Sequence, residues 1–114
     1  MQHSLVAMME LVKQSKISVE KVVEKMCHNP AVLFNVKDRG YIREGYYADL
    51  VLIDTNAPWT VEKSNVLAKC GWSPFEGQDF STKVTHTLVN GNLVYENGNI
   101  IEGSLGARLM FDRD

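Results

Sequence analysis

The sequence predicts an α+β fold in which helices come first and a small antiparallel sheet follows. Apolar residues recur at helical spacing up to about residue 34. Near the other end, Asn90-Gly91 and Asn97-Gly98 separate short runs rich in residues that favour strands, as the turns of hairpins do. Between these regions, residues 50–53 form an unbroken apolar run that is typical of a strand.

Length and charge restrict the class of protein. The 114 residues are enough for one domain with a modest core. The formal net charge of −2 argues against nucleic acid or an acidic membrane surface as a partner. No apolar run approaches the roughly 20 residues that span a bilayer, and the start of the sequence lacks the pattern of a signal peptide, so we expect a cytoplasmic protein.

Two cysteines, Cys27 and Cys70, lie far apart in the sequence, and neither has a CxxC partner. We expect two buried free thiols in preference to a disulfide or a redox pair.

The first helix is expected near the start of the chain. Ser4 is a plausible N-cap, and it precedes an apolar stripe with spacing i, i+3, i+4, i+7 made of Leu5, Met8, Met9 and Val12. A polar break at residues 14–16 ends this helix.

Two further helices are expected before residue 35. Ser18 is the expected N-cap of the second, with Glu20 in its first turn and an apolar stripe made of Val19, Val22, Val23 and Met26. Asn29-Pro30 is expected to start a third, because Pro suits the first helical position and Asn the cap. Residues 31–34 are all apolar, so the helices present more apolar surface than this chain can cover by itself.

The central stretch, residues 40–54, predicts a short strand, a glycine turn and the apolar strand 50–53. An unbroken apolar strand is expected to be covered on both faces. Asp49 is expected to cap the amides of the turn at residues 45–48, and turn hydrogen bonding is also the expected role of Asp54. General acid–base work by this pair is disfavoured, because residues five apart on a strand point to opposite faces.

The second half predicts loops followed by hairpins. We expect a loop at 55–58, an extended piece at 59–61, an ambiguous helical turn within 64–69 and a loop at 72–77. Strands at 84–89 and 93–95 flank the first Asn-Gly turn, and 100–101 is expected as a third strand. The tail from residue 105 to 114 is expected to dock on the fold.

Residues able to carry chemistry are scattered. The three imidazoles, His3, His28 and His86, form no HxH or HExxH pattern. His28 is expected to interact with carbonyls at a helix end, and His86 to pair across strands. His3 is the one that could line a site.

The remaining candidate residues indicate structural roles and not catalysis. Cys70 has no base nearby in the sequence, and the pair Gly40 and Gly45 lacks the Lys-Ser/Thr of a phosphate loop. Four aromatic residues are expected to pack in the core and loops: Trp59, Trp72, Phe75 and Phe80. The sequence therefore predicts neither a catalytic set nor metal ligands within this chain.

One pattern resembles a known family. Asn29-Pro30-Ala31, Leu33-Phe34 and then Gly40-x-Ile42-x-x-Gly45-x-x-Ala48-Asp49-Leu50-Val51 are similar to the C-terminal signature of the cyclic amidohydrolases. Each motif alone is weak, whereas their order and spacing together are specific. The dihydroorotase family within that group is indicated by further similar segments: residues 2–5, 72–77, 89–95 and 107–113.

The resemblance implies an architecture. Cyclic amidohydrolases pair a (β/α)₈ barrel with a β-sandwich built from both chain ends. Residues 1–36 would then be helices from the end of the barrel, and residues 37–114 the C-terminal half of the sandwich. The rest of the barrel would be the first partner of this chain. A homo-oligomer and another pyrimidine-pathway enzyme are further expected partners.

The resemblance also implies a reaction. Dihydroorotases hydrolyse the cyclic amide of dihydroorotate reversibly to N-carbamoyl-aspartate in pyrimidine biosynthesis, using two zinc ions that supply a hydroxide. The family's ligands, an HxH pair, a carboxylated Lys, two later His and an Asp, cannot be matched here, so this chain is expected to be inactive alone. Gln2 and His3 are the candidates for the rim of the active site; the alternative is that they only lead into the first helix.

Other interpretations stay open. Hydantoinases and allantoinases share the pattern of residues 40–54, and no residue that reads the substrate separates them here. An independent interaction or scaffold module is an alternative of another class, and a non-catalytic dihydroorotase-like subunit is a third.

Overall fold

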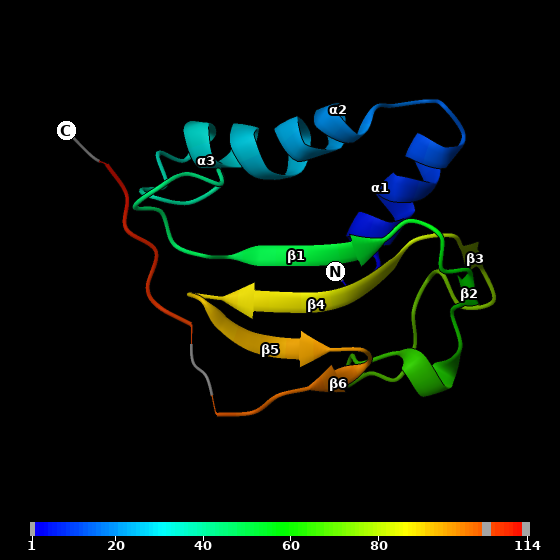
Figure 1. The fold of residues 1–114 in the computed structure, drawn as a ribbon. Helices are drawn as coiled ribbons and strands as arrows, with labels where there is room; N and C mark the ends of the chain where they lie inside the picture. Colours follow the sequence, from blue (N-terminus) through cyan, green and yellow to red (C-terminus); the bar gives the residue numbers. More distant parts are fainter. Residues whose placement is uncertain (1, 104–105, 113–114) are drawn as a thin grey trace.

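The computed structural model describes residues 2–103 and 106–112 and has the predicted α+β order. The helical part consists of α1 (Ser4–Lys13), α2 (Val19–Val23), the π-helix η1 (Glu24–His28) and α3 (Asn29–Leu33). The strands are β1 (Leu50–Asp54), β2 (Trp59–Thr60), β3 (Asp79–Phe80), β4 (Lys83–Val89), β5 (Asn92–Glu96) and β6 (Asn99–Ile100), with a 3₁₀-helix η2 (Lys63–Asn65) after β2. In Figure 1, α2 and α3 run alongside β1, and α1 lies nearer β2 and β3.

The main sheet has four antiparallel strands in the order β1-β4-β5-β6. Both predicted Asn-Gly turns are confirmed, because Asn90 and Gly91 have φ values of 52° and 80°, and Asn97 and Gly98 have 46° and 91°. The last strand, β6, begins one residue before the prediction. Successive hairpins therefore build the sheet outward from β4.

A two-stranded sheet, β2 with β3, supports the small core. Val6 of α1, Val61 and Phe80 are almost fully buried against one another. The predicted stripe of α1 missed Val6 and included Met9, which is also buried. Because α1 packs on this second sheet, its first turn comes close to the segment that follows β2.

The predicted cap of the second helix is confirmed, since Ser18 Oγ accepts from the N–H of Lys21 at 3.1 Å. The predicted cap of the first helix is wrong by one residue: α1 starts at Ser4, and His3 occupies the N-cap position. The predicted start of the third helix is confirmed, since α3 begins at Asn29 with Pro30 in its first turn, but Asn29 is not its cap, because Asn29 is itself helical with φ −61°.

A π-helical turn carries the helix past Pro30. The N–H of Asn29 donates to Glu24 O, five residues back. Proline cannot donate a backbone hydrogen bond, and its ring crowds the preceding turn of an α-helix. A wider turn before it relieves this crowding, so η1 and α3 continue α2 without a gap.

Residues 40–44 form no strand, contrary to the prediction. Tyr41 instead stacks on His28, with ring centroids 4.1 Å apart and an interplanar angle of 8°, and the Arg43 guanidinium lies 4.0 Å from the same ring. The predicted role of His28 at a helix end is therefore wrong, because His28 lies inside the helical run and packs on the turn region.

Asp49 does not cap the 45–48 turn as predicted. Its carboxylate pairs with the Arg39 guanidinium and accepts from the N–H of Asn90 at 2.9 Å. Arg39 also donates to Asn90 Oδ1 at 3.1 Å and lies 4.1 Å from the ring centroid of Tyr47. Asp49 therefore joins the glycine turns to the β4–β5 hairpin.

Apolar side chains remain exposed both on the main sheet and on the helices. Strand β1 was predicted to be covered on both faces, but Val51 and Leu52 are 47% and 49% exposed. Leu33 and Phe34 at the end of α3 are 73% and 63% exposed. The prediction that this chain cannot cover its own helices is confirmed for the residues described.

Two smaller predictions have mixed outcomes. Cys27 and Cys70 are free as predicted, but both are exposed, so their predicted burial is wrong. The tail docks over residues 110–112, where the N–H of Lys37 donates to Met110 O and the N–H of Asp112 to Asn35 O, at 2.8 and 2.9 Å. Residues 105, 113 and 114 lie outside the described part.

Within residues 2–103 and 106–112, no helix combines the length and the apolar character that a membrane span requires. The division into 1–36 and 37–114 stays a prediction.

Candidate functional site

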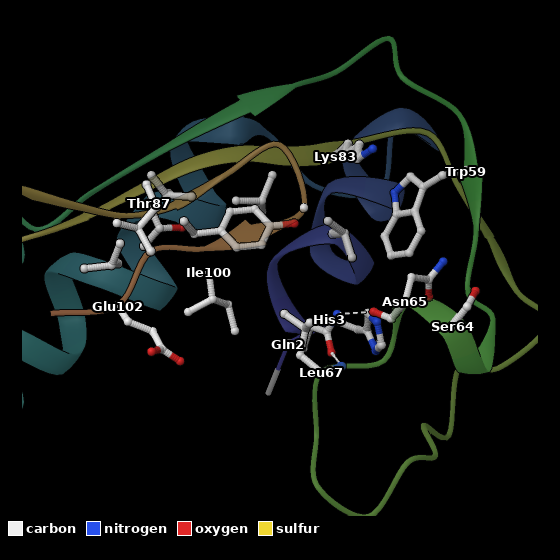
Figure 2. Close-up of a pocket in the computed structure, with 17 residues that line it drawn as sticks. Gln2, His3, Trp59, Ser64, Asn65, Leu67, Lys83, Thr87, Ile100 and Glu102 are labelled. Atoms are coloured by element: carbon white, nitrogen blue, oxygen red, sulfur yellow. Dashed lines mark hydrogen bonds between the residues drawn. The ribbon is translucent and has the colours of Figure 1, made fainter. Parts of the chain in front are cut away.

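A cavity of about 840 Å³ lies between the start of α1, the segment after β2 and one face of the four-stranded sheet. Figure 2 shows Gln2, His3 and Trp59 on one side of it and Thr87, Ile100 and Glu102 on the other. The sheet contributes mainly apolar side chains, among them Val51, Val84, Val94 and Tyr95. The face of β1 that was expected to be covered therefore opens into this cavity.

Gln2 fastens the start of α1 to the chain after η2. Its Nε2 donates to Asn65 O at 2.8 Å, and its Oε1 accepts from the N–H of Leu67 at 2.9 Å. The side-chain amide thus pairs with the backbone on both sides of residue 66, as a neighbouring strand would. Gln2 is a structural link at the cavity wall.

His3 is buried, with 5% of its surface exposed. Its Nδ1 lies 2.9 Å from Ser73 Oγ, and its ring centroid lies 5.9, 6.0 and 6.4 Å from those of Trp59, Phe75 and Phe80. Burial lowers the pKa of His3 below its ordinary value, and the positive charge of the N-terminus lowers it further. The neutral form of the imidazole is accordingly favoured.

One nitrogen of His3 has no partner. Nε2 is buried and forms no hydrogen bond within the described part of the chain. Ser73 Oγ accepts from the N–H of Phe75 at 3.2 Å, which leaves the hydroxyl proton free to go to Nδ1. If the Ser73 hydroxyl donates to Nδ1, the ring proton is on Nε2 and has no acceptor. If the ring proton is on Nδ1 and is donated to Ser73, Nε2 is an acceptor that lacks a donor.

The other candidate residues do not converge on this cavity. His86 pairs with Glu96 across β4 and β5 at 3.7 Å, which confirms its predicted cross-strand role. Asp54 accepts from the N–H of Asn56 at 2.9 Å, as predicted for a turn. Cys70 lies in the exposed loop, where its thiol contacts Trp72 O at 3.6 Å.

Metal ligands are not brought together in the part of the chain that the structure describes, where no cluster of three or more His, Cys, Asp or Glu could hold an ion. The donor set does not fit the pair of zinc ions that the resemblance implies. The cavity can bury apolar groups, but the described residues supply no metal-dependent chemistry there.

A second hollow of about 500 Å³ lies at the other end of α1. Lys13 Nζ donates to Ser81 Oγ at 2.6 Å, and the N–H of Ser81 donates to Glu10 Oε2 at 3.0 Å. These bonds fasten the end of α1 beside β3.

Sequence reasoning missed Arg39, Asn65 and Ser73 as partners of the residues it singled out. Arg39 precedes a glycine and Ser73 precedes a proline, so the sequence indicated only that both are loop residues. Their contacts bridge 10 and 70 positions of sequence, and neither periodicity nor local spacing reports on contacts of that range.

Comparison with known proteins decides the family. The Amidohydrolase family matches residues 1–94, most of the chain. This chain belongs to the amidohydrolase family. The resemblance inferred from the glycine and Ala-Asp-Leu-Val motifs is thereby confirmed.

Curated relatives of this amidohydrolase chain are dihydroorotases. The protein from Pyrococcus horikoshii is 34% identical over 103 residues, which are 90% of this chain and 24% of the relative. That from Clostridium acetobutylicum is 39% identical over 90 residues, 79% of this chain and 21% of the relative. The chain thus spans about a fifth to a quarter of the length of these relatives.

Solved structures of a hydantoinase and a dihydropyrimidinase are also similar to this chain. L-hydantoinase (dihydropyrimidinase) from Arthrobacter aurescens superposes with a TM-score of 0.75 at 32% identity, covering 80% of this chain and 20% of that one. A dihydropyrimidinase from Brevibacillus agri superposes with a TM-score of 0.76 at 29% identity, covering 81% and 20%.

Proposed function

We propose that this chain is the C-terminal region of a dihydroorotase, whose reaction is the reversible hydrolysis of the cyclic amide of dihydroorotate to N-carbamoyl-aspartate in pyrimidine biosynthesis. The observation that carries the proposal is the identity of 34% to a dihydroorotase over 90% of the chain. The named segments outside the shared glycine motif, residues 72–77 and 107–113, support the same choice.

In this proposal the chain contributes scaffold to a larger enzyme. Residues 1–36 belong to the end of a (β/α)₈ barrel, and residues 37–114 form half of a β-sandwich. Support comes from the apolar face of β1, which opens into a cavity, and from the exposed residues at the end of α3. Further strands of the same enzyme would bury these surfaces, because large apolar areas in water are unfavourable.

The chemistry is assigned to residues outside this chain. Two zinc ions, when bound elsewhere in the enzyme, would supply the activated water and polarise the amide. The described residues hold no suitable cluster for them, so we expect this chain by itself to bind no zinc and to be inactive. Gln2 and His3 stay predicted residues of the active-site rim.

We also propose the cytoplasm as the location and protein partners as the context. Beyond the rest of the barrel, these partners are a second copy of the enzyme and another enzyme of the pyrimidine pathway. Nucleic acid and membranes are not proposed, in keeping with the net charge of −2.

The test is substrate preference of the full-length protein that contains this chain. Dihydroorotate, dihydrouracil and hydantoin differ in the carboxylate that only dihydroorotate carries. We expect kcat/KM for dihydroorotate to exceed that for the other two by at least about a hundredfold, since a site built to pair with a charged group rejects analogues that lack it. A preference for hydantoin or dihydrouracil would support the second candidate, a hydantoinase, which the solved structures favour.

A further inference from the structure

Residues 67–76 form a loop that is hydrogen-bonded to the neighbouring residues Gln2 and His3 and whose Phe75 packs against the buried core. Leu67 and Trp72 in this loop are 49% and 60% exposed. Among the described residues, long-range hydrogen bonds reach the loop at Leu67, which donates to Gln2, and at Ser73, which pairs with His3. The start of α1 therefore holds the loop in place.

The His3 side chain, which holds Ser73 of the loop, can be neutral or protonated. Neutral His3 accepts the Ser73 hydroxyl proton at Nδ1 while Ser73 Oγ accepts from Phe75, which completes a short chain of hydrogen bonds. A proton added to His3 makes both ring nitrogens donors. The Ser73 hydroxyl proton then turns away, and its Oγ can only accept from Nδ1–H, beside the N–H of Phe75 from which it already accepts. The charged ring is left with an Nε2–H that has no acceptor in a buried place.

The surroundings of His3 offer no compensation for that charge. Its ring neighbours are the apolar Trp59, Phe75 and Phe80. The charged side chains on the elements around it are Glu10, Lys13, Glu62, Lys63, Lys69, Glu76, Asp79 and Lys83. None of the carboxylates among them forms an ion pair with His3, and Glu10 and Asp79 are bonded to Ser81 and Thr60.

We propose that His3 and Ser73 form a pH-dependent latch. With His3 neutral, the 67–76 loop is closed on the start of α1. Protonation of His3 opens the loop, because the charged ring has an Nε2–H without an acceptor while the loop is closed. His3 and Leu67 both line the 840 Å³ cavity, so an open latch widens its mouth. The latch rests on these contacts alone and is independent of the enzymatic activity proposed above.

Trypsin provides a direct readout, because Lys69 is the one Lys or Arg in the 67–76 loop. Cleavage after Lys69 is measured on the full-length protein that contains this chain, at pH 7.5 and pH 5.5, and each rate is divided by that for an unstructured reference peptide. We expect the normalised rate of wild type to rise at least about twofold at pH 5.5, because protonation of His3 favours the open loop.

Two substitutions and one control make the test specific. His3→Asn places an amide near Nδ1 that does not titrate, and should abolish the pH dependence. Ser73→Ala removes the latch partner and should give fast cleavage at both pH values. His28→Asn removes a histidine that stacks on Tyr41 and should retain the wild-type dependence. Equal normalised rates of wild type at the two pH values, or a rise of the wild-type size that persists in His3→Asn, would overturn the proposal.

Discussion

At the scale of single residues, a few buried polar side chains hold distant turns together. Arg39 is buried, and its guanidinium joins Asp49 and Asn90, so the glycine turns and the β4–β5 hairpin share one ion pair. The sequence alone indicated that Asp49 forms hydrogen bonds in a turn, but it did not indicate which turn supplies the donor. Besides Arg39, the partner of Asp49 is Asn90, 41 positions away, and hydrogen bonds of that range leave no local pattern.

Asp49→Asn should destabilise the fold by about 2 kcal/mol. The change removes the charge opposite a buried guanidinium, an effect discounted here because Asp49 is about a third exposed. Asp54→Asn is the matched control: among the residues that the structure describes, Asp54 accepts from the nearby Asn56 N–H alone, and an amide oxygen can replace it. Urea unfolding of both variants measures the difference, and equal costs would show that the Arg39 pair is not a main support.

The stability of the chain should fall as the pH drops below about 6.5. The pKa of His3 is lowered in the folded state, so the unfolded chain takes up a proton first and is favoured on acidification. The part of this decrease due to His3 is the difference between wild type and His3→Asn in urea unfolding across pH 5–7.5. Identical pH profiles for the two proteins would mean that His3 carries no proton linkage.

At the scale of elements, strands and hairpins were easier to predict than helix boundaries. Asn-Gly turns require positive φ at both positions, and this local rule located β4, β5 and β6 within a residue or two. Asn29-Pro30 also follows a local rule, that of a helix start, yet the chain continues helically through it. The π-turn before Pro30 packs against Tyr41 and Gly40, and sequence spacing does not reveal these contacts.

Close approach of the helical run to the first glycine turn should make Gly40→Ala costly. A Cβ there would lie 2.4 Å from Ala31 Cβ and 2.8 Å from Cys27 O, at a φ of +85°. Gly45 has a nearly equal φ of +83° and nothing within 4 Å, so Gly45→Ala reports the backbone cost alone. We expect Gly40→Ala to lose at least about 2 kcal/mol more in urea unfolding. Equal losses would show that the helix and the turn can separate freely.

At the scale of the whole molecule, the fold exposes large apolar side chains that a self-contained domain would bury. The core of Val6, Val61 and Phe80 is small, while Leu33 and Phe34 at the end of α3 are 73% and 63% exposed and residues on β1 are nearly half exposed. The α+β order and the family were predictable from periodicity and motif order. The cavity was not, because it is formed by side chains from α1, the segment after β2 and the sheet together.

Dihydroorotate hydrolysis with bound zinc, compared between this chain and the full-length protein that contains it, is the most direct measurement. We expect hydrolysis and roughly two zinc ions per molecule in the full-length protein, and neither in the 114-residue chain, whose described residues offer no ion-binding cluster. A full-length protein that is inert and free of metal would contradict the assignment to dihydroorotase and favour a non-catalytic amidohydrolase-like scaffold.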